Sequence, residues 1–503
     1  MSDLKAHVPS RPLLWPDIIF ELKEVLADLP DEIYIVGGAV RDALLHRPLK
    51  DVDLATSGDA IRLARKIANH FNGDFFPLDS ERDVGRALID TPEGRLMFDV
   101  ARFRGEDILA DLTDRDFTIN AMAADLRGDL SLLLDPMNGE GDIGSRQLRR
   151  CSVFAVSNDP IRALRAVRQS VQLGLHIESS TLADMRAVKS YLPDVSPERL
   201  RDELFKLLAL PKPVSALRIA DTVGLLEIIL PELMPLHGLK QSAPHIHDAW
   251  THTLAVVDNL SNVISVLDFN RSDNLTSSFS MGTMAVQLDR FRKQLRIHIN
   301  TEWPNERSHR ALLMLAALMH DVGKPATAAQ NAEGRWRFID HENVGAKMIE
   351  SRADDLRLSN AERQRLVMII RNHMRPLFLQ ELTPRAVHRF WRETGDAGVD
   401  ICLLSLADYL GTRTTFIDQD EWLVFIDRIR LLLEAYFDQH DTLVSPPTLI
   451  DGNQLMQSFK LKPGRIIGEL LDLIREAQVA GEIDSPDAAL AFAQNHLEKN
   501  KVD

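Results

Sequence analysis

Strand signals are confined to about the first 150 residues of this sequence, and that asymmetry limits the fold more than any other feature. Short apolar runs such as Ile33-Tyr34-Ile35-Val36 alternate there with amphipathic stretches such as 59–71, the pattern of strands mixed with helices. Beyond this region apolar residues recur at helical spacing, and the rest of the chain reads as helical. The clearest helical segments are 159–173, 181–192, 197–209 and 213–229. The sequence therefore predicts an α+β fold in which a mixed sheet with helices precedes all-α domains.

The length of 503 residues is too great for one hydrophobic core, so several domains are expected. We expect a mixed head over residues 1–150 and a helical neck and body over 151–240. A third helical domain is predicted over 241–440, and a helical tail over 441–503. The polar and irregular stretch 262–308 is predicted to be, in part, a loop insertion in the third domain.

Cysteine content and hydropathy indicate a cytoplasmic protein. The two cysteines, Cys151 and Cys402, lie far apart in sequence and suggest neither a disulfide framework nor a cysteine zinc cluster. No uninterrupted apolar run approaches the length of a membrane span, so no membrane partner is expected.

The charge of the chain does not decide whether it binds nucleic acid. The formal net charge of −15 argues weakly against an RNA partner, because nucleic-acid binders usually carry a basic footprint. Locally the balance is reversed, since residues 146–206 hold 11 Lys and Arg against 7 Asp and Glu. If RNA binds, we expect it to bind there, although a solvated helix face explains the same charges equally well.

Two aspartates one residue apart, Asp51 and Asp53, follow a strand–glycine–helix unit. Alternate residues of a strand point to the same face, and two neighbouring carboxylates repel each other unless a cation lies between them. Upstream, the strand 33–36 runs into Gly37-Gly38 and a helix, where backbone N–H groups can approach a triphosphate. Each feature alone is usually a surface pair or a turn. Together they favour a divalent-metal site that binds a nucleotide.

The order strand, Gly-Gly, helix, strand, Asp-x-Asp resembles the polymerase-beta type of nucleotidyltransferase. Residues 36–42 (Val-Gly-Gly-Ala-Val-Arg-Asp) and 50–56 (Lys-Asp-Val-Asp-Leu-Ala-Thr) are specifically similar to the bacterial and eukaryotic tRNA nucleotidyltransferase/poly(A) polymerase family. The resemblance continues in residues 115–122, which in the family recognise the ribose, and in 158–168, the neck helix that selects the base. The nucleotide-binding residues it implies are Gly37, Gly38, Arg41, Arg115, Asp116, Asn120, Asp159, Arg162, Arg165 and Arg168.

The neck residues suit this role physically. Asp159 and Arg162 are three apart on one helix face, where a carboxylate and a guanidinium can imitate the Watson–Crick edge of a base. Without the upstream motifs, a helical salt bridge with solvated arginines would be the preferred interpretation. Three positions depart from the family pattern and leave base specificity open: Asn158 for glutamate, Asp114 for a basic residue, and Gln169 for an aromatic residue.

The resemblance implies two-metal catalysis. Asp51 and Asp53 would be catalytic and would hold Mg²⁺, which acidifies the RNA 3′-hydroxyl and neutralises the leaving pyrophosphate. Asp99 stands where the family often has a third catalytic acid, and a surface aspartate at a strand end is an equal alternative. The mobile loop that separates specificities within the family is expected in residues 80–98, and its presence disfavours an enzyme that adds only C.

A second group of metal-binding residue types lies in the third domain. His320-Asp321 ends an apolar helix, and a lone histidine there would usually be a packed side chain. The flanking candidates are His252, His341, His373 and Asp408. This order resembles the HD phosphohydrolase superfamily, and many tRNA nucleotidyltransferases carry such a domain after the neck. Imidazole with carboxylate suits Mn, Ni, Fe, Zn or Mg ions. A degenerate domain that only braces RNA is the alternative.

The leading hypothesis is a tRNA nucleotidyltransferase that uses CTP and ATP to build the 3′ CCA end and binds the acceptor and TΨC stems. An A-adding enzyme, a CC-adding enzyme and a poly(A) polymerase remain open within the family. Two alternatives come from other classes: an RNA or nucleotide phosphohydrolase with a non-catalytic head, and a non-catalytic RNA-binding protein.

Overall fold

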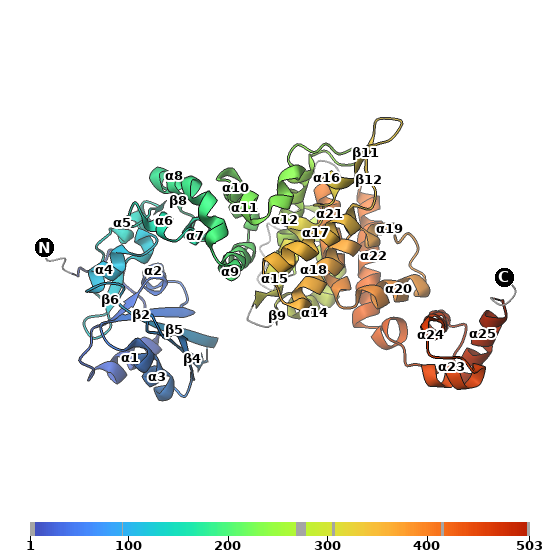
Figure 1. Cartoon of the computed structure of the whole chain (residues 1–503), viewed down its shortest axis with the longest axis horizontal. Helices are drawn as coiled ribbons and strands as arrows, with labels where there is room; N and C mark the ends of the chain where they lie inside the picture. The colour runs from blue at the N-terminus through green and yellow to red at the C-terminus, as the bar shows by residue number, and fades with distance from the viewer. Residues whose placement is uncertain (1–5, 93, 268–277, 304–306, 414–416, 500–503) are drawn as a thin grey trace. The chain divides into compact units, whose positions relative to one another are not determined.

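The computed structural model describes residues 6–92, 94–267, 278–303, 307–413 and 417–499 (Figure 1). The chain divides into two compact units: residues 1–195 with 219–228, and residues 196–218 with 229–503. We call these the first and second units and describe each by itself. None of the helices within the described ranges is long and apolar enough to cross a membrane. The four predicted domain limits stay a prediction.

A six-stranded mixed sheet forms the centre of the first unit, with strand order β3-β4-β5-β2-β1-β6. The strands are β1 (Ile33–Val36), β2 (Asp51–Thr56), β3 (Asp74–Asp79), β4 (Val84–Thr91), β5 (Gly94–Arg102) and β6 (Ala123–Asp125). Strands β2 and β5 pair in parallel, whereas the other neighbours pair antiparallel. The predicted strands are confirmed in β1, β2, β4 and β5. Strand β3 escaped prediction because it is an edge strand whose side chains are mostly exposed and which contains a proline.

Helices complete the first unit. They are α1 (Asp17–Leu26), α2 (Gly38–Leu44), α3 (Ala60–His70), α4 (Ile108–Thr113), α5 (Gly139–Gly144), α6 (Ala155–Asn158), α7 (Ile161–Leu173) and α8 (Ser179–Ala187), with 3-10 turns at η1 (Thr118–Asn120) and η2 (Val188–Asp194) and a short pair β7 (Gln147–Leu148) and β8 (His176–Ile177). Helix α3 begins because the Asp59 side chain accepts a hydrogen bond from Arg62 N. It buries Leu63 and Ile67 in the same core as Phe98 of β5. Burial of a side chain the size of Phe98 stabilises the fold by about 1.5–3 kcal/mol.

Residues 80–98, expected to hold the loop that separates specificities within the family, form mostly the β4–β5 hairpin in the described residues, and the mobility of this segment stays a prediction. The two strands pair over their whole length, with Ala87 opposite Phe98. Gly85 lies against α3, where a Cβ would be 2.8 Å from the Ala64 Cβ. Strand β4 alternates buried and partly exposed side chains, as a strand with one face in the core requires.

The second unit is helical apart from two short hairpins in the described ranges. Its elements include α9 (Pro197–Leu208), η3 (Pro231–Leu236), α12 (Ala249–Val266), α13 (Phe279–Leu288), η5 (Asp289–Phe291), α14 (Arg292–Ile299), α15 (His309–Met319), α16 (Lys324–Thr327), α17 (His341–Asp355), α18 (Asn360–Asn372), α19 (Arg375–Phe378), α20 (Pro384–Thr394), α21 (Ala397–Thr412), α22 (Gln419–Phe437) and the π-turn η6 (His440–Val444). Helices α10 (Pro213–Thr222) and α11 (Leu226–Ile229) belong partly to each unit. Every residue of α21 is buried, because this helix is apolar on all sides and packs against α12, α15, α18 and α22.

The C-terminal tail has a small core of its own. Helices α23 (Gly452–Phe459), α24 (Arg465–Val479) and α25 (Pro486–Lys499) follow the Pro446-Pro447 linker. Leu455, Ile467 and Ile474 are buried together in this core. The Glu476 carboxylate accepts from Arg389 Nε of α20 at 2.7 Å, which ties the tail to the rest of the second unit.

The described residues of the stretch 262–308 are mostly regular, and the insertion predicted for part of this stretch stays a prediction. Helices α12, α13 and α14 and the pair β9 (Glu302–Trp303) and β10 (Arg307–Ser308) account for its described residues almost entirely. The polar segments 268–277 and 304–306 lie outside the described residues. Met281, Met284 and Leu288 are buried at helical spacing in α13, a pattern that the neighbouring polar residues masked.

A buried carboxylate joins four elements of the second unit. The Asp400 carboxylate of α21 contacts His298 Nε2 and His309 Nε2 at 2.9 Å each, and it accepts from Arg365 Nε at 2.6 Å. Burial raises its pKa, but His298, His309 and Arg365 outweigh burial and hold the pKa of Asp400 well below its usual range. Asp400 is therefore ionised at neutral pH and links α14, α15 and α18 to α21.

Asp400→Asn should lower the free energy of unfolding by about 3–5 kcal/mol, because it removes the buried counter-charge of the Arg365 guanidinium. The measurement is urea unfolding followed by tryptophan fluorescence, since Trp250, Trp303, Trp336, Trp391 and Trp422 of the six tryptophans lie in the second unit. Asp396→Asn is the matched control. Asp396 also contacts Arg365, at 2.5 Å, but its side chain is 70% exposed, so its loss should cost less than about 1 kcal/mol. Equal losses in the two variants would contradict the burial argument.

Candidate functional site

The first candidate site lies where β1, β2 and β5 run side by side. Asp53 on β2 is in register with Val36 at the end of β1 and with Asp99 on β5. Asp51 precedes Asp53 by two residues, so both side chains belong to the same strand face, and Asp51 is exposed. The sheet thus brings the three predicted acidic residues onto neighbouring strands.

Gly37 is the closest backbone neighbour of this site. It has a φ of +74°, a conformation that favours glycine. A Cβ at this position would lie 2.9 Å from Arg115 Nη1 and 3.0 Å from Asp53 Oδ2, so the position also lacks space for a side chain. Three residues predicted from separate motifs, Gly37, Asp53 and Arg115, therefore meet at one point.

The pKa of Asp53 is displaced from its ordinary value. Burial raises the pKa of Asp53 to about 6; Arg115 lowers it, and Asp99 and Asp51 raise it. A carboxylate that ionises reluctantly among like charges gains much from a divalent cation, and Asp51 and Asp53 offer the oxygen donors that Mg²⁺ prefers. Asp99 is already paired, because its two oxygens accept from Arg86 at 2.7 and 2.8 Å. Arg86 was not among the predicted residues.

A chain of hydrogen bonds connects the three nucleotide-binding motifs. Arg41 Nη1 donates to Asn120 Oδ1 at 2.5 Å, and Asn120 Nδ2 donates to Asp116 Oδ1 at 2.9 Å. Arg165 Nη1 of α7 donates to the other Asp116 oxygen at 3.0 Å. Asn120 Nδ2 also donates to Gln169 Oε1 at 3.0 Å, so the residue noted only as a departure from the family is part of the network. The sequence signal that could have identified Gln169 is a polar side chain on the buried face of a helix.

The two residues predicted to read the base, Asp159 and Arg162, lie just before and at the start of α7. Arg162 is 8% exposed and donates to the backbone carbonyls of Ala155 at 3.0 Å and Asp114 at 3.1 Å. Its Nε lies 3.9 Å from Asp159 Oδ2, which is the outer limit of an ion pair. The backbone carbonyls thus hold the Arg162 guanidinium more tightly than the Asp159 carboxylate holds it. Arg168 lies apart from the hydrogen-bond chain and donates to Gln172 of the same helix at 3.0 Å.

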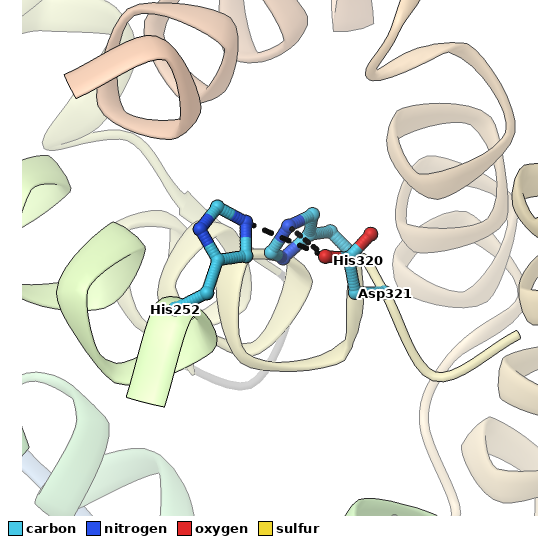
Figure 2. Close-up of side chains that lie close together, drawn as sticks. All are labelled: His252, His320 and Asp321. Carbon is cyan, nitrogen blue, oxygen red and sulfur yellow. Dashed lines mark ion pairs between the residues drawn. The ribbon is translucent and has the colours of Figure 1, made fainter. Parts of the chain in front are cut away.

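The second candidate site collects six side chains from five helices of the second unit. His252 lies in α12, His320 and Asp321 follow α15, His341 begins α17, His373 follows α18 and Asp408 lies in α21. Figure 2 shows His252 and His320 turned toward the Asp321 carboxylate, with Nε2–Oδ2 distances of 3.4 and 3.1 Å. His341 Nε2 and His373 Nε2 lie 3.4 and 3.9 Å from the other Asp321 oxygen. Asp408 Oδ1 is 3.1 Å from His252 Nε2. All six predicted residues are therefore brought together.

The histidine rings are oriented for metal binding. His320, His341 and His373 each direct Nδ1 at a backbone carbonyl, of Ala317, Phe338 and Ile370, at 2.7–2.8 Å. That contact fixes the tautomer with the proton on Nδ1 and leaves the Nε2 lone pair for a ligand. Their Nε2 atoms are buried and make no hydrogen bond with any described residue. Such orphaned acceptors beside two carboxylates fit a divalent transition-metal ion.

Protonation states agree with this fit in part. Burial lowers the pKa of His252, but hydrogen bonds to Asp321 and Asp408 outweigh burial and raise it to about 9, so this ring must give up a proton when a metal binds. Burial, with the charges of His320 and His341, lowers the pKa of His373 to about 3, so its imidazole is neutral at pH 7. Burial raises the pKa of Asp321, but His320 and Lys324 outweigh burial and hold it well below the usual range. Neutral imidazole and ionised carboxylate are the forms that coordinate a metal.

Four protein families match successive segments of the chain. The Poly A polymerase head domain matches residues 33–149, and the probable RNA and SrmB-binding site of polymerase A matches 174–236. The HD domain matches 279–412, and the putative domain 2 of tRNA nucleotidyltransferase matches 430–493. The HD match begins after His252, which the fold nevertheless brings to the metal-binding set.

Curated relatives cover almost the whole chain. An A-adding tRNA nucleotidyltransferase of Deinococcus radiodurans is 30% identical over 492 residues, 96% of this chain and 99% of the relative. A CC-adding tRNA nucleotidyltransferase of Thermus thermophilus is 30% identical over 476 residues, 92% of this chain and 93% of the relative. The fold is that of a solved CCA-adding enzyme with ATP, at a TM-score of 0.59 and 18% identity over 96% of this chain and 95% of that one. The predicted resemblance is thus confirmed, and the chain belongs to the tRNA nucleotidyltransferase/poly(A) polymerase family, as a member with an HD domain.

Proposed function

We propose that this nucleotidyltransferase adds C and A nucleotides, from CTP and ATP, to the 3′ end of tRNA without a template. The observation that carries the proposal is the meeting of Asp53, Gly37 and Arg115 at the sheet edge, with Asp99 in register, in a chain that matches tRNA nucleotidyltransferases along nearly its whole length. Catalysis of this kind is mostly positioning and charge stabilisation.

The head residues take the following roles in the proposal. Asp51 and Asp53 would hold Mg²⁺, which when bound acidifies the RNA 3′-hydroxyl and neutralises the charge of the leaving pyrophosphate. The RNA 3′ oxygen bonds to the α-phosphorus of the incoming nucleotide as the bond to pyrophosphate breaks. Asp99, in register with Asp53 and held in place by Arg86, is the third acidic residue of the proposed site.

The remaining predicted residues bind the nucleotide. Backbone groups of Gly37 and Gly38 approach the triphosphate, with Arg41 and Arg115 as its cationic partners. Asp116 and Asn120 receive the ribose, and their hydrogen bonds to Arg41 and Arg165 hold them in place beforehand. The base is read by Asp159 and Arg162, whose guanidinium the backbone of residues 114 and 155 orients. Arg168 contacts phosphate from the exposed side of α7.

The RNA partner is expected to be the folded upper half of tRNA, its acceptor and TΨC stems. Helical RNA is recognised largely by shape and backbone contacts, and the basic stretch 146–206 supplies cations for them. The tail helices α23 to α25 are a second candidate contact. Two free cysteines, both buried, agree with a cytoplasmic location.

The second candidate function is a narrower nucleotide specificity within the same family. The two relatives named above are an A-adding and a CC-adding tRNA nucleotidyltransferase, and the segment expected to be a specificity loop is the β4–β5 hairpin. An A-adding or CC-adding enzyme, or a poly(A) polymerase, is separated from a CCA-adding enzyme by one assay. The protein is incubated with tRNAs lacking CCA, lacking only the terminal A, or complete, with CTP, ATP or both, and the products are sequenced. Addition of all three nucleotides to the shortest tRNA supports the leading proposal.

Asp51→Ala and Asp53→Ala should each reduce the rate of nucleotide addition by more than about a hundredfold, because each removes a proposed metal ligand. Loss of a residue that only contacts a metal ligand usually reduces activity by about 10–100-fold. RNA affinity should change little, because it rests on many phosphate contacts. Asp90→Ala is the control, an 88% exposed carboxylate of the same sheet that should leave addition unchanged. Near-normal addition by either Asp51 or Asp53 variant at millimolar Mg²⁺ would favour a non-catalytic head.

We also propose an accessory phosphohydrolase activity at the HD set. His252, His320, Asp321 and Asp408 would bind one ion of Mn, Ni, Fe or Mg, and His341 and His373 would complete a second position or hold phosphate. A bound ion acidifies water enough for attack on phosphorus at neutral pH. A 2′,3′-cyclic phosphate or a terminal phosphate on damaged RNA is the proposed substrate, because opening the bond to the 3′ oxygen restores the hydroxyl that the head extends. A structural brace is the competing interpretation.

The HD set should bind a transition ion in the absence of RNA. Isothermal titration of Mn²⁺ or Ni²⁺ into chelator-treated protein carrying Asp51→Ala and Asp53→Ala should reveal binding that His320→Gln weakens by at least about tenfold. His388→Gln is the matched control, since His388 is equally buried but bonds the Leu443 carbonyl at 3.0 Å, away from the set. Equal weakening by both substitutions would indicate general destabilisation rather than lost ligation.

His320→Ala with Asp321→Ala should lose metal-dependent opening of a 2′,3′-cyclic end while still extending intact tRNA. The two activities are measured on one preparation, so retained extension shows that the double variant is folded. Absence of hydrolysis by the unaltered protein with Mn²⁺, Ni²⁺, Fe²⁺ and Mg²⁺ would make the domain a structural brace.

A further inference from the structure

The two arginines proposed above to meet the triphosphate are largely engaged by other side chains. Arg41 Nε and Nη2 each donate to Asp42 at 3.0 Å, and its Nη1 donates to Asn120 at 2.5 Å. Arg115 Nε and Nη2 donate to Asp111 Oδ2 at 3.0 and 2.8 Å. Each guanidinium is thus paired with a carboxylate, and the two arginine side chains are only 10% and 13% exposed. A nucleoside triphosphate carries several negative charges, so a further cation at this site would strengthen its binding.

Arg104 lies beside Arg115 with its side chain half exposed. After β5 ends, two hydrogen bonds fix the path of the backbone: Phe103 N donates to the Thr56 carbonyl at 3.0 Å, and Arg104 N donates to Asp111 Oδ1 at 3.1 Å. The buried Asp111 carboxylate therefore holds the Arg115 guanidinium by one oxygen and the backbone of Arg104 by the other. One carboxylate thereby keeps the two arginines next to each other before any ligand binds.

The N–H groups of the Arg104 guanidinium are available to a ligand. Its partners among the described residues are Asp111, whose Oδ1 is 4.0 Å from Nε, and Asp114, whose Oδ2 is 3.8 Å from Nη1. Both distances exceed the length of a hydrogen bond, so these carboxylates attract the guanidinium without occupying its donors. Asp114 is also 55% exposed, and solvent weakens its attraction. A guanidinium presents its donors in a planar fork that suits phosphate oxygens.

The charges around Arg104 favour an anion at this position. Burial lowers the pKa of Arg104, and the neighbouring cations Arg115 and Arg162 lower it further, although two carboxylates raise it. A cation among other cations gains from an anion that binds between them. Arg104 in turn lowers the pKa of Asp53, so its charge reaches the proposed metal ligand as well. A nucleotide whose base is read by Arg162 and whose phosphates meet a metal on Asp53 would have its phosphates within reach of Arg104.

From this arrangement we infer that Arg104 is a further triphosphate-binding residue of the head site. Its guanidinium donates to phosphate oxygens of the incoming nucleotide and makes no contact with the base, so it serves CTP and ATP alike. Asp111 is the positioning residue, because it orients Arg115 and the backbone of Arg104 together. This inference deepens the proposed nucleotide addition and rests on it, although triphosphate binding can be measured without addition.

The first test is binding of inorganic tripolyphosphate and of ATP, each with Mg²⁺ and in the absence of RNA. The protein carries His320→Ala with Asp321→Ala to minimise binding at the HD set, and affinities are measured by isothermal titration calorimetry. Arg104→Ala should weaken the binding of both ligands by about tenfold or more, the usual effect of losing a hydrogen bond to a charged group. Arg104→Lys should weaken both by a smaller factor, because lysine keeps the charge and loses the planar fork.

Arg95→Ala is the matched control for this test. Arg95 is 47% exposed, lies near the other end of β5, and pairs with Asp74 and Asp90, so its loss should leave both affinities unchanged. Weaker binding of ATP with unaltered binding of tripolyphosphate in Arg104→Ala would overturn the phosphate contact. Unaltered affinity for both ligands, or equal losses in Arg95→Ala and Arg104→Ala, would overturn it as well.

The second test separates the nucleotide from RNA as the source of the phosphate. Arg104→Ala should raise KM for ATP and for CTP by about tenfold or more and leave KM for tRNA within about threefold of its original value. A raised KM for tRNA with an unaltered KM for both nucleotides would make Arg104 an RNA contact and overturn the inference. If the unaltered protein adds no nucleotide but binds tripolyphosphate through Arg104, the proposed nucleotide addition fails and the triphosphate-binding role of Arg104 stands.

Discussion

The parallel pairing of β2 with β5 is the constraint on which the head site depends. It sets Asp53 beside Asp99, and the antiparallel pairing of β1 with β2 brings the end of β1, with Gly37, to the same place. A shift of one residue in either register would turn the aspartates to the opposite face of the sheet. The buried side chains of Val52, Leu54 and Phe98 oppose that shift, since it would expose them. The hydrophobic core therefore determines where the catalytic carboxylates lie.

The two candidate sites each contain a buried aspartate, and the pKa values of these two aspartates are shifted in opposite directions. Burial raises the pKa of Asp53 to about 6 among two other carboxylates and two arginines, so Asp53 gains from a cation supplied from outside. Asp321 is surrounded by histidines and Lys324, and its pKa is held well below the usual range. The first arrangement suits a Mg²⁺ that arrives with the nucleotide, because carboxylate charge is the main attraction. The second suits a resident transition ion, because orphaned imidazole nitrogens add ligands of their own.

Local patterns explain what could be predicted from the sequence. Alternating apolar residues predicted β4 and β5, a backbone requirement for glycine lies behind Gly37, and the order of histidines and aspartates identified the HD set. Local patterns also misled, since polar residues after α12 hid the helical spacing of Met281 and Met284. Contacts between residues far apart in the sequence could not be predicted from it. Arg86 with Asp99, and Asp400 with its histidines, join residues whose proximity only the packed chain creates.

Gln169 shows how a departure from a family pattern can still serve the site. It occupies the buried face of α7, where an aromatic residue would contribute only packing. Its Oε1 accepts the second proton of the Asn120 amide, whose first proton is donated to Asp116. An amide with both protons engaged cannot rotate without breaking a buried hydrogen bond, which costs about 1–3 kcal/mol. Gln169 therefore orients Asn120, and with it the Asn120 oxygen that receives Arg41, so the neck helix helps to arrange the head residues proposed to hold the ribose and triphosphate.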